Sequence, residues 1–440
     1  MSQSESVPTR HQNPLVRTVI AGAVGNVMEW YDFGLFGFFA PTLAVLFFPK
    51  EDRLASLAGT FGVFATGFLM RPLGGVLFGR LGDRVGRKRA LELSVLLMAS
   101  STTLLGLLPT YATLGPFAAM LLTVVRLLQG LSVGGEYVGS MSFLVEHAPA
   151  NRRAFVGSWS SFTVVLGSLM GSGVASLATS VLSESQLTSW GWRVPFLAGS
   201  LFGVVGLWLR RGVAESPVFL ETQKAGGLAE NPIADVLRHD RRAFFVTLGL
   251  TGLSSVGFYI PFVWLASWLS RINTPALPES QVLAANTVAL FALLVFTPLS
   301  GLASDRLGRR PMFLVSAVGY TILSYPIMRY LSHGTLQAAM LGSLAFAAIN
   351  GVYSGCMAAT MVELFPTRTR YTGIAISYNL GQAVLGGTAA LVATSLIEST
   401  GDNLAPAWYL SACSGVAAVA ALFIPARHGR PLDDCSDQGS

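Results

Sequence analysis

Long apolar stretches alternate with short polar segments along the whole chain of 440 residues. A helix needs roughly 20 mostly apolar residues to cross a hydrocarbon layer about 30 Å thick. The stretches that meet this requirement predict twelve spans, which cover residues 18–47, 54–80, 90–109, 116–146, 154–182, 193–210, 243–269, 280–304, 312–331, 336–363, 371–397 and 406–425. Several are longer than required, so we expect those helices to tilt or to project into water. The pattern predicts an all-α membrane protein with twelve transmembrane helices.

A ten-residue motif occurs twice, each time where an apolar stretch gives way to basic residues. Residues 79–88 (GRLGDRVGRK) recur as residues 301–310 (GLASDRLGRR), about half the chain length later. A second pair of loops, around Glu146 and Glu363, repeats at nearly the same offset. Two matched loops in the same order indicate a duplicated membrane unit, which predicts two pseudo-symmetric six-helix bundles.

The longest polar connection falls between the sixth and seventh spans and contains Pro217, Gly226, Gly227 and Pro232. It is the natural linker between the two copies. We therefore expect an N-terminal bundle in residues 1–210, a cytoplasmic linker in 211–242, a C-terminal bundle in 243–425 and a short cytoplasmic tail in 426–440.

Composition and charge agree with this class. Hydrophobic residues make up 52% of the chain and charged residues 12%, which is too little charge to solvate a globule of this size. If both termini are cytoplasmic, most of the 29 Lys and Arg residues lie on the inner side, as the positive-inside rule requires. The net charge of +6 then follows from topology, and we expect no nucleic-acid partner. No removable signal peptide is visible, so we expect a multi-pass protein of a bacterial-type inner (plasma) membrane.

No pattern of enzyme chemistry or metal ligation is visible. Cys356, Cys413 and Cys435 lie in two spans and the tail, which predicts neither a disulfide framework nor a metal site. Without a nucleophile or histidine cluster, we do not expect an enzyme. The expected partners are a small-molecule substrate, a proton as coupling ion and the lipid bilayer, with no cofactor, and we expect a monomer.

Charged residues well inside the predicted spans, away from the span ends, lie in the first half of the chain. Each costs roughly 2.5–3.5 kcal/mol near the bilayer centre, so such residues usually face a cavity and have a function. Span one holds Glu29 and Asp32, span two Arg71, and span four Arg126 and Glu136. The last two are ten residues apart, about 15 Å along a helix, and cannot pair with each other. We expect Asp32 to be the partner of Arg126, and Arg71 that of Glu136 or Glu29.

Two interpretations of these charges remain open. They could form closed salt bridges that only hold three helices together, although buried ion pairs seldom repay their desolvation. Alternatively, three carboxylates against two arginines leave one acid without a full counter-charge, and such an acid can carry a proton at physiological pH. We favour this second interpretation, with Asp32 as the first candidate for proton coupling, then Glu29 and Glu136.

The second half offers aromatic and amide side chains instead of charges near its span centres. Packing or lipid contact explains many of the aromatics, whereas amides are costlier in lipid and more often face a cavity. Together with the first half, this predicts an asymmetric binding site with one charged and one aromatic or amide wall. The predicted substrate-binding residues are Arg126, Gln129, Asn26, Tyr31, Tyr259, Asn350, Tyr353, Tyr378 and Asn379, with Arg71 as a charge partner.

The duplicated motif also has a physical interpretation. Its first glycine allows close helix contact, its aspartate can accept from a helix N-terminus or an arginine of the other half, and its second glycine permits a tight reversal. We therefore expect an inner gate. Its predicted residues are Gly79, Asp83, Arg84, Gly86 and Arg87 in the first copy, and Asp305, Arg306, Gly308 and Arg309 in the second.

These motifs resemble those of the major facilitator superfamily, as does the run from Arg126 to Gly130. More narrowly, the chain resembles the metabolite:proton symporter family of that superfamily. The residues that carry this resemblance are 25–33 (GNVMEWYDF), 71–75 (RPLGG), 134–137 (GGEY), 190–196 (WGWRVPF) and 215–217 (ESP). The resemblance implies the major facilitator fold, a central cavity and alternating access coupled to a proton. It does not fix the substrate.

Members of that family carry organic acids or zwitterions such as proline and betaine. The osmosensing proline and betaine members have a long C-terminal coiled coil, whereas about fifteen polar residues follow span twelve here. Arg126 is a cation near mid-depth, and the carboxylates are assigned to the proton. We therefore expect import of a small organic acid, such as a di- or tricarboxylate, with a zwitterionic solute as the alternative. A drug exporter is less expected, because the stretch from Gly167 to Gly173 lacks the exporters' proline.

Overall fold

The computed structural model describes residues 14–48, 52–85, 87–133, 136–211, 232–366, 369–426, 429–430 and 432. Nine helices in this part of the chain are long and apolar enough to cross a membrane, and a bent pair makes a tenth span. Two shorter apolar helices, Glu92–Leu107 and Arg193–Val205, occupy the places predicted for spans three and six. The twelve predicted spans therefore all correspond to helical segments.

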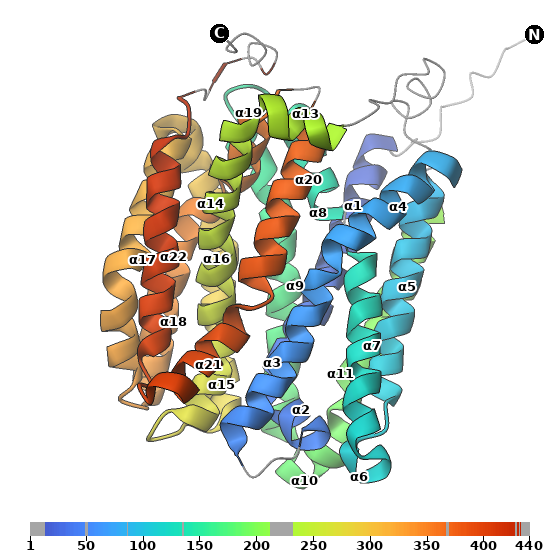
Figure 1. The fold of residues 1–440 in the computed structure, drawn as a ribbon, viewed down its shortest axis with the longest axis vertical. Coiled ribbons are helices and arrows are strands. Elements are labelled where there is room, and N and C mark those ends of the chain that lie inside the picture. The colour runs from blue at the N-terminus through green and yellow to red at the C-terminus, as the bar shows by residue number, and fades with distance from the viewer. Residues whose placement is uncertain are drawn as a thin grey trace, which may run out of the picture.

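The first half of the chain forms the bundle coloured blue to green in Figure 1. Its helices are α1 (Pro14–Phe38), α2 (Ala40–Phe47), α3 (Arg53–Leu69), α4 (Arg71–Val85), α5 (Arg87–Leu107), α6 (Tyr111–Leu114), α7 (Pro116–Ser132), α8 (Glu136–Glu146), α9 (Arg153–Val181), α10 (Glu184–Gln186) and α11 (Arg193–Arg211), with a π-helical turn at Leu187–Gly191.

The second half forms the bundle coloured yellow-green to red. Its helices are α13 (Pro232–His239), α14 (Arg241–Tyr259), α15 (Leu265–Ser267), α16 (Glu279–Leu307), α17 (Arg309–Leu331), α18 (Leu336–Ser354), α19 (Met357–Leu364), α20 (Arg370–Gly381), α21 (Ala389–Thr400) and α22 (Ala405–Leu422), with π-helical turns at Ile260–Trp264, Trp268–Ile272 and Gln382–Gly386.

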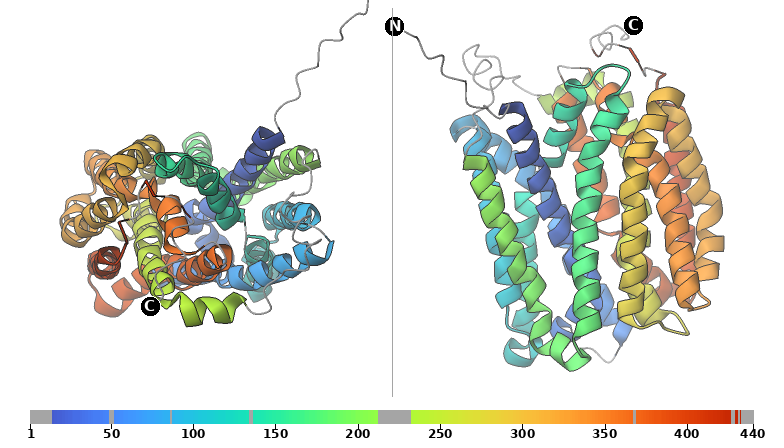
Figure 2. Two further views of the ribbon diagram at one scale, coloured as in Figure 1. Left: turned by 90° about the horizontal axis from the view of Figure 1, so that it is seen from above. Right: turned by 180° about the vertical axis from the view of Figure 1, so that it is seen from behind.

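The two bundles stand side by side, and α1 begins at the same face at which α22 ends (Figures 1 and 2). We call this the terminal face. A main contact between the bundles runs along α9 and α16. Gly301 makes the close approach possible, because a Cβ there would lie 2.9 Å from the Ala154 carbonyl oxygen and 3.1 Å from the Ser158 Cβ. The first glycine of the repeated motif is thus a packing position in its second copy.

Several spans are interrupted where the bundles face each other. The first predicted span bends by 62° between α1 and α2, and Pro41, the second residue of α2, lacks the N–H that a continuous helix would need. A continuous span 18–47 is therefore wrong. The π-helical turn after Tyr259 contains Pro261, and a second π-helical turn begins at Gln382. Such turns redirect side chains inside an otherwise regular helix and are frequent at functional sites.

Candidate functional site

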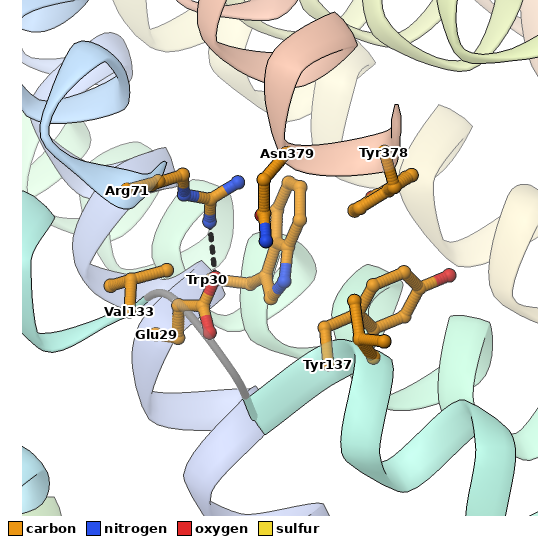
Figure 3. A pocket seen from close by; sticks show the side chains of 8 residues that line it. Glu29, Trp30, Arg71, Val133, Tyr137, Tyr378 and Asn379 are labelled. Atoms are coloured by element: carbon orange, nitrogen blue, oxygen red, sulfur yellow. Dashed lines mark hydrogen bonds and ion pairs between the residues drawn. The ribbon is translucent and has the colours of Figure 1, made fainter. Parts of the chain in front are cut away.

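A small pocket lies between the two bundles (Figure 3). Its volume is about 10 Å³, roughly the room for a single water molecule. The first half supplies Glu29, Trp30, Arg71, Val133, Tyr137 and Val138, and α20 of the second half supplies Tyr378 and Asn379. The structure therefore shows a state in which this region has closed around very little space.

Arg71 and Glu29 form a buried ion pair at one side of this pocket, drawn as the dashed line in Figure 3. Arg71 is the first residue of α4, after the helix break at Met70. Its guanidinium also lies 4.7 Å from the Phe68 ring centre and 5.7 Å from that of Trp30. Of the two partners expected for Arg71, the structure places Glu29 against it. The side chain of Glu136 lies outside the described residues.

A second polar chain joins Arg126 to Asp32 through Gln129. Arg126 Nη1 donates to Gln129 Oε1 at 2.9 Å, and Gln129 Nε2 donates to Asp32 Oδ2 at 2.5 Å and to Thr102 Oγ1 at 3.2 Å. These side chains are buried. Asp32 is thus the partner of Arg126 as expected, but through the amide of Gln129, one helical turn from Arg126, which lies between the two charges.

The guanidinium of Arg126 is set in an aromatic cup. Its Cζ lies 4.4 Å, 4.5 Å and 5.4 Å from the ring centres of Phe33, Phe36 and Phe64. Its Nε and Nη2 have no hydrogen-bond partner in the described part of the chain. Gly67 leaves room here, because a Cβ would lie 3.3 Å from Nη2. A buried cation with free donors can accept an anionic group, since unsatisfied charged donors are costly.

Aromatic rings from both halves of the chain pack together beside these polar groups. The Trp30 and Tyr259 rings stack with centres 6.1 Å apart, and Phe258 meets Trp30 edge-on at 5.8 Å. Phe68 packs on Tyr259 at 5.2 Å. Within the described residues, Trp30 Nε1, Tyr259 Oη and Gln382 Oε1 are buried without a hydrogen-bond partner. These polar atoms come from both halves and border the same interface, so a ligand bound there would find both π faces and hydrogen-bonding groups.

Two further predicted residues from the second half reach this region. Tyr378 lines the pocket and stacks at 5.3 Å on Tyr137, and its hydroxyl accepts a bond of 3.0 Å from Gln382 Nε2. Asn379 lines the same pocket. The π-helical turn that begins at Gln382 therefore starts three residues after Asn379, within one helical turn of the two residues that line the pocket.

Four other predicted residues are engaged away from the pocket. Asn26 Nδ2 donates to Ser140 Oγ and Thr163 Oγ1, and the Tyr31 hydroxyl donates to the Pro195 carbonyl. Asn350 Nδ2 donates to the Gly257 carbonyl and to Tyr320 Oη, and Tyr353 stacks on Phe313. Each contact ties helices of one bundle together. Tyr31 also reaches an apolar groove of about 610 Å³ between α9 and α11.

Several residues that build the site were not among the predicted ones. Trp30 and Phe33 adjoin the two acids on α1, and Phe64 and Phe68 sit on α3 one turn apart. For Phe33 and Phe68 the sequence signal was present, because they follow Glu29 and Phe64 by four residues and that spacing places side chains on one face of a helix. Thr102, in contrast, has no such signal, since α5 carries many hydroxyl residues that bond only to their own helix.

The second copy of the repeated motif joins the two bundles at the terminal face. Asp305 accepts the backbone N–H groups of Ala154 and Phe155, both at 2.9 Å, at the N-terminus of α9. A carboxylate is well placed there, because the first N–H groups of a helix lack internal partners. Gly308 ends α16 with a φ of 95°, which a glycine adopts readily.

Arg309 completes this cluster. It donates to Asp305 at 2.9 Å and makes a bidentate contact with Glu363 at 3.1 Å and 2.9 Å. Arg306, in the same motif, is exposed. The side chains of the first-copy motif, from Gly79 through Asp83, Arg84 and Gly86 to Arg87, lie outside the described residues.

Two more ion pairs cross between the bundles at this face. Arg370 contacts Glu146 at 2.9 Å, and Arg153 approaches Glu363 at 3.9 Å. We call the contacts of Asp305 with α9, Arg370 with Glu146, and Arg153 with Glu363 the terminal-face latch. The second pair of repeated loops, around Glu146 and Glu363, thus supplies both glutamates of the terminal-face latch.

Comparison with known proteins gives a consistent family. The family model described as sugar (and other) transporter matches residues 18–240 and 272–437. The glycine betaine/proline/ectoine/pipecolic acid transporter OusA of Dickeya dadantii is 33% identical over 435 residues, covering 97% of this chain and 86% of that protein. The proline/betaine transporter of Escherichia coli K12 is 34% identical with the same coverage. The alpha-ketoglutarate permease of that strain is 35% identical over 407 residues, covering 92% and 93%.

Solved structures agree on the fold. The crystal structure of a D-xylose-proton symporter superposes with a TM-score of 0.76 at 19% identity, covering 95% of this chain and 100% of that one. The major facilitator proton:xylose symporter XylE bound to 6-bromo-6-deoxy-D-glucose gives 0.75 at 18% identity, covering 96% and 98%. By the family model and the 33–35% identical relatives, the chain belongs to the sugar (and other) transporter family, with the major facilitator fold, and it is a membrane transporter and not an enzyme.

Proposed function

We propose that this transporter is a proton-coupled symporter that imports a zwitterionic compatible solute, such as betaine or proline, across a bacterial inner membrane. The names of the 33–34% identical relatives support this substrate class. The organic acid expected from the sequence becomes the second candidate. The abundance of Lys and Arg near the terminal face supports a cytoplasmic position for that face.

One observation carries the proposal: an arginine with unused donors and a stacked aromatic pair border the same interface between the bundles. Arg126 offers Nε and Nη2 to a carboxylate. Trp30 and Tyr259 stack on each other here, and once that stacking opens their faces would offer a cation–π site, worth about 0.5–2 kcal/mol for an organic cation. The argument against a zwitterion was that its cation would need a carboxylate already used for the proton. The aromatic pair removes that difficulty.

The proton would be carried by Asp32, with Glu29 and Glu136 as further candidates. Asp32 is buried and contacts a neutral amide, and its Oδ1 has no hydrogen-bond partner among the described residues. Glu29, in contrast, has Arg71 directly against it. An uncharged Asp32 is therefore less costly to form than an uncharged Glu29. Each charge moved down about 100 mV provides about 2.3 kcal/mol, or roughly 40-fold accumulation.

The terminal-face latch would be the inner gate. Its contacts join the two bundles, so they must break if the pocket is to open toward that face by rocking of one bundle against the other. The substrate would be contacted by Gln129, Tyr378 and Asn379. The helices that carry the site would be held in place by Asn26, Tyr31, Asn350 and Tyr353.

Transport in proteoliposomes tests the proposal. Purified protein would be supplied with labelled betaine, proline, citrate and 2-oxoglutarate, with and without an inwardly directed proton gradient. We expect labelled betaine or proline to accumulate in the presence of the gradient. The accumulated label should leave the liposomes when a protonophore collapses the gradient. Accumulation that does not respond to the gradient, or no uptake of either zwitterion, would contradict the proposal.

A small organic acid is the second candidate, because the 35% identical relative is an alpha-ketoglutarate permease. The second buried cation, Arg71, could hold a second carboxylate only by giving up Glu29. Competition decides between the two candidates. If unlabelled 2-oxoglutarate or citrate displaces a labelled substrate and betaine and proline do not, the organic acid is the substrate.

A further inference from the structure

We propose that Gln129 is the positioning residue that couples the proton to the substrate: its amide keeps Arg126 engaged while Asp32 is ionised and releases it when Asp32 takes up a proton. A substrate carboxylate would then bind the guanidinium more tightly after protonation. This inference rests on the proposed proton-coupled transport of a carboxylate-bearing solute and names the residue that links the two events.

The chemistry of the neighbours fixes the orientation of the amide. An ionised carboxylate only accepts hydrogen bonds and a guanidinium only donates them. Gln129 must therefore turn its nitrogen to Asp32 and its oxygen to Arg126, as the bonds of 2.5 Å and 2.9 Å show. Thr102 Oγ1 donates to the Met98 carbonyl and is thereby left to accept from the same nitrogen. While Asp32 is ionised, each contact holds the amide in one orientation.

Protonation of Asp32 changes this requirement. When the proton is on Oδ2, the oxygen bonded to Gln129, that oxygen becomes a hydroxyl donor and requires an acceptor where the Gln129 nitrogen now lies. Turning the amide would supply this acceptor but would place the amide nitrogen against Arg126 Nη1, donor against donor. Nη1 then joins Nε and Nη2 as a free donor, so a guanidinium no longer bonded to Gln129 can turn all its free donors to a substrate carboxylate. The proton comes from the outer solution and leaves to the inner one, and no other bond is made or broken.

The surroundings contain few groups that could replace this link. In the described part of the chain, Arg126 is the charged neighbour that acts on Asp32, and Asp32 in turn acts on the neutral phenol of Tyr31. Arg126 has Asp32 and Arg71 as its charged neighbours and lies near the neutral phenol of Tyr259. The amide of Gln129 is the group that is hydrogen-bonded to both Asp32 and Arg126 among the described residues.

Two substitutions separate coupling from simple support of Arg126. Gln129→Leu removes the amide and leaves Arg126 free at every pH. We expect substrate exchange to persist and gradient-driven accumulation to be lost. The change in substrate affinity across the pH series should become at least tenfold smaller than in the wild type. Gln129→Glu supplies a permanent acceptor to Arg126, so we expect at least tenfold weaker binding across the pH series, in line with a hydrogen bond to a charged group.

Ser132→Ala is the matched control, because its buried hydroxyl donates to the backbone carbonyl of Gln129 and not to the amide. It should keep wild-type coupling. Binding and exchange of labelled proline or betaine would be measured in reconstituted protein over a pH series. If Gln129→Leu does not fold, Gln129→Asn, which is too short to reach both partners, is expected to flatten the same pH dependence.

The outcomes distinguish the inference from the function on which it rests. If wild-type protein neither binds nor accumulates a zwitterion, the proposed function fails, and the same series can be run with 2-oxoglutarate. If the wild type transports but Gln129→Leu keeps the wild-type pH dependence and accumulation, the coupling role is wrong. Loss of exchange together with accumulation in that variant would show that Gln129 only supports the site.

Discussion

The two walls of the central site are built from different chemistry although they belong to two copies of one unit. The wall on α1, α4 and α7 holds two buried arginines, two acids and the amide that links one pair. The wall on α14 and α20 presents Tyr259, Tyr378 and Gln382, next to π-helical turns. Duplication preserved the helices and the latch motif, whereas the charges near mid-depth remain a property of one half.

This difference suggests a division of work. The charged wall can change protonation state, because its acids and bases are connected through hydrogen bonds. The aromatic wall cannot do so as readily, but its helices contain turns of non-standard geometry that permit bending. We expect substitutions in the first wall to alter coupling and substitutions in the second to alter selectivity.

The largest effect is expected for Asp32→Asn. An asparagine cannot exchange a proton, so gradient-driven accumulation should be abolished while exchange of substrate across the membrane persists. Both activities would be measured in the same proteoliposomes. Glu29→Gln serves for comparison and should impair binding by leaving Arg71 unpaired. Full accumulation by Asp32→Asn would move the proton site to another acid.

Arg126→Lys should weaken substrate binding by at least tenfold, because a point charge replaces a planar fork that can hold a carboxylate with two bonds. Affinity measured in reconstituted protein is the readout. Thermal stability of the unliganded protein should change much less than affinity. An affinity equal to that of the wild type would exclude Arg126 as the carboxylate site.

Tyr259→Leu sharpens the contrast between the walls. Loss of the ring should weaken betaine binding roughly two- to 30-fold, from a cation–π contribution of about 0.5–2 kcal/mol. The affinity for any carboxylate that lacks a cation should hardly change. Tyr259→Phe keeps the π face and is the control. Equal losses for betaine and for such a carboxylate would show that the aromatic wall provides packing alone.

A smaller effect is expected at the latch. Asp305→Asn removes the negative charge at the N-terminus of α9, which is worth about 0.3–1 kcal/mol, so opening toward the terminal face should rise about two- to fivefold. Labelling of a cysteine introduced behind the latch would report it. Asp52→Asn is a matched helix cap at the start of α3 and should leave labelling unchanged. Unchanged labelling in Asp305→Asn would leave the motif without a gating role.

The fold could be predicted almost completely from the sequence, because membrane spans follow from length and apolarity and the duplication from a repeated motif. The site could be predicted only in part. Asp32, Arg126 and Gln129 stand out as polar groups in apolar helices. The insertion of the Gln129 amide between the two charges depends on helix rotation, which spacing does not determine. The stacking of Trp30 on Tyr259 joins two halves of the chain, and no pattern along the sequence indicates that these two rings meet.

The contact between Asp305 and α9 has a consequence for how the latch tolerates sequence change. The partner atoms are backbone N–H groups, so replacing the side chain of Ala154 or Phe155 leaves both donors in place. The contact therefore does not depend on which side chains stand at these two positions, whereas it does depend on the carboxylate of Asp305. Proline is the exception, since it alone lacks the donor, and a first helical turn accepts it. Ala154→Pro would delete a single hydrogen bond of the latch without touching a charge.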